Sequence, residues 1–433
     1  MSIKKAILTI VGISLFAFTP ALAPAQEQIH IYVGAPGQNK FPLALPKPVG
    51  GGAAADSFYE TVVNDLQLSG YVDIINEQAY IEPQGTGVRP GDFRFEDWSI
   101  TGAVGLAKTK YTFGEQTNAE VWVYDVAGRR KLGAKSFSGN PQSVRTLAHK
   151  VSAEIIYRLT GQSVPFNTRF AFSGNFTGNK EIYLVDFDGE NRARLTRNGA
   201  INIKPRWSPS GQKIAFTSYL RGNPDLYVAD LAKGSIRRIS AREGLNIGAS
   251  FAPDEQSMTV TLSSDGNAEI YRINALNGRK IARLTRSYGI DTSAVYSPDG
   301  SEIAFVSERA GGAQIYVMSA DGSNPRRITF EGKINTDPAW SPDGKTIAFV
   351  NQGATFDVFT VRTDGTGLTR ITQGMGSNED PSWSPDGNYI SFSSTRTGSS
   401  HIWMSTKDGV HQKQLSNGKG NYTNPSWSPY INW

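Results

Sequence analysis

The chain has 433 residues, and its 44 Lys and Arg against 39 Asp and Glu give a net charge of +5. It has no cysteine, which excludes thiol catalysis, cysteine-ligated zinc and iron–sulfur clusters. The charge excess is too small to indicate a nucleic-acid partner, and the length allows two or three domains with a large core.

The first 25 residues have the pattern of a secretory signal peptide. Two lysines precede an apolar run from Ala6 to Phe18, which is too short to span a bilayer. The stretch Ala23-Pro24-Ala25 places small residues before a cut, so we expect cleavage after Ala25 and export of the mature chain. An uncleaved membrane anchor is the alternative.

Residues 26–165 contain no repeat and mix strand and helix patterns. Alternating apolar residues at Ile29, Ile31 and Val33 indicate a strand or a strand-competent tail. The elements expected after it are a Pro- and Gly-rich loop over 35–52, a helix over 54–68, a strand over 71–75, a loop over 82–95, strands near 100–106 and 120–125, and a helix over 141–159. This mixture predicts a small two-layer α/β domain.

A short block recurs six times in the rest of the chain. Each block has an aromatic residue followed by a turn that resembles Ser-Pro-Asp-Gly, and the blocks begin at Trp207, Phe251, Tyr296, Trp340, Trp383 and Trp427. Successive blocks are 44, 45, 44, 43 and 44 residues apart. Pro sets φ at the second turn position and Gly accepts a positive φ, so each block predicts a type I turn. The second block has Glu255 where the turn glycine is expected.

Three further strand-like runs follow each turn, and four strands in about 44 residues is the length of a propeller blade. The first repeat lacks its Ser-Pro block, whereas the last block has almost nothing after it. We therefore expect a six-bladed β-propeller in which the C-terminal strand completes the first blade and pairs the open edges. An open stack of repeats is the alternative, and it would need caps that the sequence does not show.

The sequence contains no recognisable catalytic motif. It has no Gly-x-Ser-x-Gly elbow, no His-Glu-x-x-His, no phosphate loop and no dinucleotide fingerprint. Its four histidines lack metal-ligand spacing, and His149 is expected to pack on the second long helix. We therefore predict a protein that is not an enzyme and has no cofactor.

Polar residues just before the aromatic anchors should ring the mouth of the propeller channel. They are Lys204, Gly248, Ser293, Asp337, Asp380 and Asn424, with Asn246, Thr292, Thr336, Glu379 and Thr423 nearby. Loops on a rigid scaffold commonly carry function, so these residues are candidates for partner contact. Asp337 and Asp380 are also candidates for a divalent-cation site. Solvated loop residues without a ligand are the alternative.

The joins between the two parts carry a resemblance to a known family. Leu147-Ala148-His149 through Leu159-Thr160-Gly161, Phe166 to Phe172, and Asn424-Pro425-Ser426-Trp427-Ser428-Pro429-Tyr430 are similar to the junction and the C-terminal signature of the TolB family. The resemblance covers essentially all of the mature chain. The family supplies the periplasmic component of the Tol–Pal system of Gram-negative bacteria.

The resemblance implies a protein-binding role at two places. Family members bind the outer-membrane lipoprotein Pal at the propeller mouth, which corresponds here to Lys204, Asn246, Thr292, Ser293, Thr336, Asp337, Glu379, Asp380, Thr423 and Asn424. They also offer a mobile N-terminal segment to the C-terminal domain of the inner-membrane protein TolA, which corresponds here to Gln28, Ile29, His30, Ile31, Tyr32 and Val33. Alternating apolar residues in this segment suit the addition of a strand to a partner's sheet edge.

The expected organisation is a signal peptide over 1–25, a mobile segment over 26–40, an α/β domain over 41–165 and the propeller over 166–433. We expect a periplasmic monomer that reaches membranes only through its partners and supports outer-membrane integrity and constriction at cell division. One alternative is a propeller that serves a hydrolase, for which the front domain is too short. The other is a propeller that binds a soluble small ligand or sugar in its channel.

Overall fold

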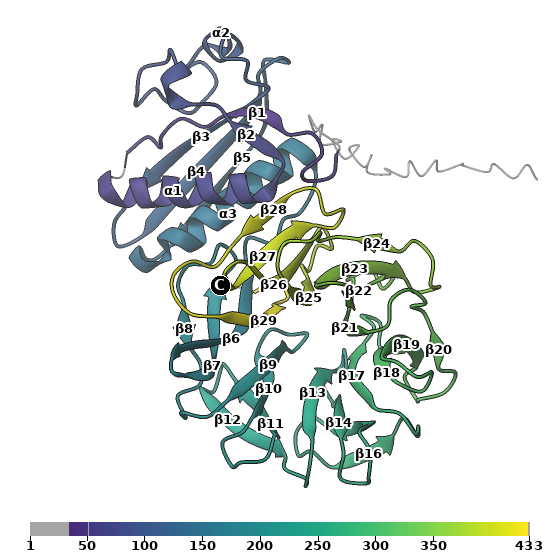
Figure 1. The fold of residues 1–433 in the computed structure, drawn as a ribbon. Helices are drawn as coiled ribbons and strands as arrows, with labels where there is room; N and C mark the ends of the chain where they lie inside the picture. The colour runs from purple at the N-terminus through teal and green to yellow at the C-terminus, as the bar shows by residue number, and fades with distance from the viewer. Residues whose placement is uncertain (1–33, 51, 432–433) are drawn as a thin grey trace, which may run out of the picture.

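A five-stranded mixed sheet covered by two long helices forms the N-terminal domain of the computed structural model, which describes residues 34–50 and 52–431 (Figure 1). The strands follow the order β2-β1-β3-β4-β5, with bounds β1 Phe41–Ala44, β2 Val72–Ile74, β3 Gly105–Thr112, β4 Thr117–Asp125 and β5 Arg130–Gly139. The helices are α1 Gly52–Ser69, the short α2 Phe95–Ser99 and α3 Val144–Thr160, with single 3₁₀ turns at Glu77–Ala79 and Pro141–Ser143. The two-layer α/β prediction is confirmed.

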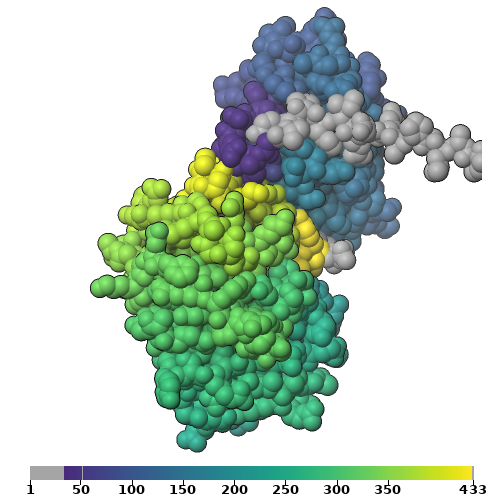
Figure 2. All heavy atoms as spheres, turned by 90° about the vertical axis from the view of Figure 1, so that its right-hand side faces the viewer, coloured from purple at the N-terminus to yellow at the C-terminus, as the bar shows by residue number. Residues whose placement is uncertain are grey.

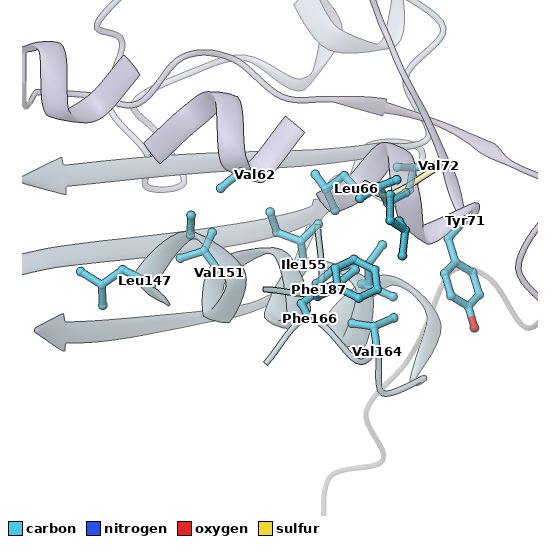
Figure 3. Packing of buried hydrophobic residues seen from close by; sticks show 14 of the residues in the cluster. Val62, Leu66, Tyr71, Val72, Leu147, Val151, Ile155, Val164, Phe166 and Phe187 are labelled. Atoms are coloured by element: carbon cyan, nitrogen blue, oxygen red, sulfur yellow. The ribbon is translucent and has the colours of Figure 1, made fainter. Parts of the chain in front are cut away.

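The two long helices pack on the sheet through apolar residues spaced three and four apart. In α1 these include Val62 and Leu66, and in α3 they include Leu147, Val151 and Ile155, all of them buried (Figure 3). The helix α3 ends at Gly161, whose left-handed backbone lets its N–H bond to the carbonyl of Tyr157 at 2.8 Å. Both helices therefore form where the apolar periodicity predicts them.

Three elements of this domain differ from the prediction. The strand β1 lies inside the segment expected to be a loop, β5 was not expected, and α2 precedes a strand β3 that begins later than predicted. In β1 the sequence Phe-Pro-Leu-Ala hides the strand signal, because Pro42 has no N–H for the ladder. In β5 no side chain is buried, five being exposed and five half-buried, so no alternating apolar pattern marks that strand.

Six four-stranded antiparallel sheets form a closed ring, as predicted. Five blades are continuous in sequence: β9–β12, β13–β16, β17–β20, β21–β24 and β25–β28. The sixth, which we call the closing blade, has the order β29-β6-β7-β8 and joins β29 (Tyr422–Trp427) to β6 (Arg169–Thr177), with Trp427 opposite Phe170. The remaining strands of the closing blade are β7 (Asn179–Asp186) and β8 (Ala193–Arg194).

The outer strands of the other blades have these bounds: β10 Lys213–Ser218, β11 Asp225–Asp230, β12 Ser235–Ser240, β14 Ser257–Leu262, β15 Glu269–Asn274, β16 Lys280–Arg283, β18 Glu302–Ser307, β19 Gln314–Ser319, β20 Arg326–Arg327, β22 Thr346–Gln352, β23 Phe356–Arg362, β24 Thr369–Arg370, β26 Tyr389–Thr397, β27 Ser399–Thr406 and β28 Gln412–Gln414.

The aromatic anchors pack between neighbouring blades, as expected. The indole N–H of Trp383 donates to the carbonyl of Ala339 at 3.1 Å, and that of Trp340 donates to the carbonyl of Val295 at 3.1 Å. In both pairs the acceptor belongs to the preceding blade, so each anchor ties one blade to the next.

The α/β domain rests on the closing blade and on the β25–β28 blade (Figures 1 and 2). One apolar cluster runs through both parts and includes Leu66, Ile155, Phe166, Phe187 and Trp427 (Figure 3). The Tyr389 hydroxyl adds a buried hydrogen bond of 2.7 Å to the carbonyl of Ser69. A shared core of this kind holds the domains together as packed neighbours.

Two sequence predictions fall on residues that the structure does not describe. They are the signal peptide over 1–25 and the proposed TolA-contacting residues Gln28 to Val33, both of which lie outside the described residues. Within residues 34–50 and 52–431, none of the helices has the length and apolar character needed to cross a membrane.

Candidate functional site

The innermost strand of every blade carries a β-bulge immediately before its aromatic anchor. These strands are β9 Asn202–Trp207, β13 Asn246–Phe251, β17 Asp291–Tyr296, β21 Asn335–Trp340, β25 Asn378–Trp383 and β29. The ladder register shifts once in each of them. At each shift one residue has a positive φ: Lys204 53°, Gly248 63°, Ser293 54°, Asp337 51°, Asp380 56° and Asn424 53°. A bulge of this type re-aims side chains, and here it repeats around the ring.

The structure brings the six bulge residues together inside the channel rather than at its mouth. Lys204, Gly248, Ser293 and Asp337 enclose a space of only about 20 Å³. The Nζ of Lys204 reaches across the ring to Oδ1 of Asp337 at 2.9 Å. This ion pair constricts the channel between its two ends.

The charges around this ion pair bear on Asp337 and Asp380, which were considered as candidates for a divalent-cation site. The Asp337 carboxylate raises the pKa of Lys204. Burial alone would raise the pKa of Asp337, but Lys204 offsets this effect and lowers it. Asp380 is bonded elsewhere, since its Oδ1 accepts a hydrogen bond of 2.9 Å from the side-chain amide of Asn424. The ammonium group of Lys204 therefore lies beside Asp337, and the amide of Asn424 lies beside Asp380, where a metal ion had been considered.

Four of the neighbouring candidates precede the bulges and are half-buried: Thr292, Thr336, Glu379 and Thr423. Burial and the nearby charges of Asp380 and Asp337 raise the pKa of Glu379. Asn246 is different, because it starts β13 and is fully buried. Its Oδ1 accepts from the Ser240 hydroxyl at 2.6 Å and from the N–H of Arg242 at 3.0 Å, so it supports the loop that joins β12 of the preceding blade to β13 and does not face the channel mouth as predicted.

The end of the channel at which the innermost strands begin is surrounded by loops, and we call it the loop mouth. Exposed large apolar residues lie in these loops: Ile201, Leu220, Tyr288, Ile290, Ile334 and Met375. Met375 is 60% exposed. Exposed apolar groups in one region commonly mark a protein-binding surface. The sequence analysis missed them because a single apolar residue in a loop gives no periodic signal.

The opposite end of the channel is formed by the Ser-Pro turns, and we call it the turn mouth. Trp340, Trp383, Trp427 and neighbouring prolines line a cavity of about 230 Å³ there. Contacts with the α/β domain come from this end of the blades, as the bond from Tyr389 to Ser69 shows. The loop mouth is therefore left free of the α/β domain.

The residues that precede β1 lie between the two domains. The N–H of Gly37 donates to the carbonyl of Gly70 at 2.9 Å, and the Gln38 side chain donates to Asp408 of the propeller at 3.1 Å. A Cβ on Gly37 would lie 2.8 Å from the Cβ of His411. Gly37 thus permits a close approach, whereas the sequence analysis had placed this residue in the mobile segment over 26–40.

Comparison with known proteins agrees with this architecture. Two family models match the chain: the TolB beta propeller domain over residues 156–431 and the TolB amino-terminal domain over residues 29–132. The Tol-Pal system protein TolB of Geobacter sulfurreducens is 39% identical over 211 residues, which are 47% of this chain and 48% of that protein. The chain thus spans about half the length of curated relatives of this kind.

Longer matches exist as well. The Tol-Pal system protein TolB of Anaeromyxobacter dehalogenans is 35% identical over 333 residues, which cover 76% of this chain and 65% of that protein. The crystal structure of TolB from Acinetobacter baumannii superposes with a TM-score of 0.82 at 26% identity, covering 93% of this chain and 100% of that one.

Proposed function

Since this chain belongs to the TolB family, we propose that it is a non-enzymatic periplasmic adaptor of the Tol–Pal system. In this proposal the loop mouth binds a Pal-like outer-membrane lipoprotein. The segment from Gln28 to Val33 binds the C-terminal domain of a TolA-like inner-membrane protein. By joining the two, the monomeric protein supports outer-membrane integrity and envelope constriction at cell division.

The observation that carries the proposal is the group of exposed apolar residues at the loop mouth. A protein interface needs apolar groups to desolvate and polar groups around them to fix the register. Ile334 and Met375 supply the first kind, and the half-buried Thr336 and Glu379 supply the second. The α/β domain packs at the other end of the ring and leaves room for a partner here.

The alternative of a soluble ligand in the channel has weaker support. Pockets for small molecules usually enclose roughly 300–1,000 Å³. The space around the Lys204–Asp337 ion pair is about 20 Å³, and the cavity at the turn mouth is about 230 Å³. A macromolecule that covers the loop mouth from outside fits these dimensions better than a sugar inside the channel.

The Pal site is tested by charge substitutions at the loop mouth. We expect Ile334→Asp with Met375→Asp to weaken binding of a Pal-like lipoprotein at least roughly tenfold, because both apolar side chains would be buried in the complex. Isothermal titration calorimetry with the purified proteins measures the affinity. The matched control, Leu276→Asp with Ile281→Asp, changes exposed apolar residues in the turn after β15 and in β16, and it should bind like the parent chain. Equal losses in both variants would refute the assignment.

The TolA site is tested by removing residues 26–33 from the mature chain. This deletion spares Gly37 and Gln38, whose contacts join the two domains. We expect binding to the C-terminal domain of a TolA-like protein to disappear while Pal binding persists, as measured by surface plasmon resonance. Unchanged binding to TolA would place that site elsewhere.

A further inference from the structure

A cluster of charged side chains is buried where the two domains meet. Asp65 comes from α1, Arg145 and His149 come from α3, and Asp188 comes from the turn that follows β7 in the closing blade. Asp65 is 0% exposed, His149 3% and Asp188 6%. His149 was expected only to pack on its helix, and the function proposed above does not use any of these residues.

The contacts within the cluster connect the two domains through charged groups. Nδ1 of His149 lies 2.8 Å from Oδ2 of Asp65, and both residues belong to the α/β domain. The guanidinium of Arg145 forms an ion pair with Oδ2 of Asp188, which belongs to the propeller. A carboxylate oxygen of Asp65, a carboxylate oxygen of Asp188 and an imidazole nitrogen of His149 all lie within 4.8 Å of one another.

The charge count of the cluster depends on whether the domains are docked. In the α/β domain alone, the Asp65 carboxylate and the Arg145 guanidinium balance each other with a neutral imidazole. Docking brings in the second carboxylate, that of Asp188, and the buried cluster then carries one net negative charge. Burying an unbalanced charge costs several kcal/mol, so an extra positive charge is needed. Protonation of His149 supplies one.

A divalent metal ion would balance the cluster less well. With a neutral imidazole, two carboxylates and one guanidinium, an ion of charge +2 would leave a net charge of +1, whereas a single proton leaves zero. Arg145 also already occupies Oδ2 of Asp188. The charges therefore favour a proton over a metal ion at this position.

We propose that docking of the α/β domain onto the propeller takes up a proton at His149, so that the contact between the two domains tightens as the pH falls. The inference stands apart from the proposed function, because it concerns only the two domains of this chain. The pH of the surroundings can therefore change how firmly the two domains are held together.

The expected direction of the pH dependence agrees with the groups that surround His149 and Asp65. Burial disfavours the charged imidazole, but Asp65 and Asp188 outweigh burial and the repulsion of Arg145, and they raise the pKa of His149. Burial raises the pKa of Asp65 as well. A raised pKa in the docked state means that the stabilisation is complete below the ordinary histidine pKa and is lost as the pH rises through the raised value.

The first test is an NMR titration of the His149 Cε1–H signal in the mature chain and in two variants. In the parent chain His149 should titrate above its ordinary pKa of about 6.5. Asp188→Asn removes the carboxylate that docking brings in, and it should lower the proton affinity of His149 roughly tenfold or more. The matched control is Asp408→Asn, which changes another propeller carboxylate at the domain contact, one bonded to Gln38. It should leave the titration unchanged.

The second test follows docking itself by hydrogen exchange of peptides covering residues 66–70 and 186–190, corrected for the intrinsic effect of pH. Protection should fall as the pH rises in the parent chain and should become independent of pH in His149→Gln. The proposal is overturned if His149 is neutral at pH 6 in the folded parent chain, or if Asp188→Asn leaves its titration unchanged. It is also overturned if protection does not follow that titration, or if Zn²⁺ alone restores protection at high pH and a chelator removes it.

Discussion

Glycines in the turns between the third and fourth strands bring several blades into close backbone contact with the preceding blade. The clearest case is Gly278, with φ of 69°, where an added Cβ would lie 1.8 Å from the carbonyl oxygen of Ile239 in the preceding blade. Gly234 lies in the equivalent turn of the preceding blade and has φ of 61°, but an added Cβ there would meet nothing within 4 Å. Substitutions at the two glycines therefore separate the cost of backbone strain from the cost of a steric collision.

We expect Gly278→Ala to lower the free energy of unfolding by roughly 2–5 kcal/mol, because strain and a collision with backbone add together. Gly234→Ala should cost only the strain, roughly 1–2 kcal/mol. Urea denaturation of both variants measures the difference. Similar losses in the two would show that the contact between blades carries little of the stability.

Glu255 replaces the glycine of the other Ser-Pro turns, and its carboxylate forms contacts that a glycine could not form. It keeps the positive φ, at 56°, while Oε1 accepts from the N–H of Ser210 at 2.7 Å and Oε2 lies 2.9 Å from Nζ of Lys213. Burial works against the charge, but the hydrogen bonds from Ser210 and Lys213 lower the pKa of Glu255 to about 2. The carboxylate thus ties its turn to the preceding blade.

A lowered pKa gives a pH dependence of known sign. The contribution of Glu255 is complete above its ordinary pKa of 4.5 and is lost as the pH falls through about 2. We expect Glu255→Gln to unfold more easily at pH 7 by about 1–2 kcal/mol and to lose less stability than the parent between pH 5 and pH 2. Chemical denaturation at several pH values measures both effects. Glu243→Gln, an exposed change in the loop before β13, should follow the parent.

At the scale of elements, the short fourth strands are held by a buried side-chain network. Thr285 follows β16, and its hydroxyl donates to Oε2 of Glu269 at 2.5 Å and accepts from the N–H of Ile270 at 2.9 Å. Arg283 completes the network with a contact of 3.1 Å to Oε1 of Glu269. The Arg-Leu-Thr sequence seen at this point therefore marks a strand that is too short to hold itself by ladder bonds alone.

Thr285→Val keeps the shape of the side chain and removes its hydroxyl. We expect a loss of about 1–3 kcal/mol, because Glu269 loses a buried donor and the N–H of Ile270 loses its acceptor. Thr369→Val on the exposed β24 is the control and should change stability by less than about 0.5 kcal/mol. Thermal unfolding by circular dichroism compares the two, and equal melting temperatures would contradict the role given to the network.

Element by element, the sequence was informative where repetition or periodicity reinforced the signal. The blades, their four strands and both long helices followed from patterns that recur many times. The strand β1 could not be predicted because Pro42 conceals it, and β5 could not because none of its side chains is buried. The bulge of Lys204 was also hidden, since its positive φ arises from pairing with β10 and not from its residue type.

The candidate site was predictable only in part, because it is assembled from six separate strands. The spacing of the repeat correctly grouped Lys204, Asp337 and Asp380 around one channel. It could not show that Lys204 neutralises Asp337, nor that Asn246 is buried against the loop between β12 and β13, because both facts depend on which side of a strand each residue occupies. The meeting of Asp188 with His149 likewise depends on how one domain is placed on the other.

For the whole molecule, the strand β29 closes the ring by completing the closing blade. This strand pairs with β6, and the indole of Trp427 donates to Thr168 at 2.8 Å and packs on Phe170. We expect a chain that ends at Asn421 to lose cooperative unfolding and to aggregate, because β6 would present an open edge. Size-exclusion chromatography and calorimetry measure both properties. A chain that ends at Ile431 keeps β29 and should behave like the full-length protein.

The pairing of β29 with β6 also has a consequence for how the protein is made. The strand β6 is synthesised before every other propeller strand, and its inner partner is synthesised after all of them. The α/β domain can fold as soon as it emerges, whereas the ring must wait with one edge unsatisfied until its last strand arrives. The most vulnerable period in the life of this protein is therefore the interval between those two strands, when a chaperone has the most to protect.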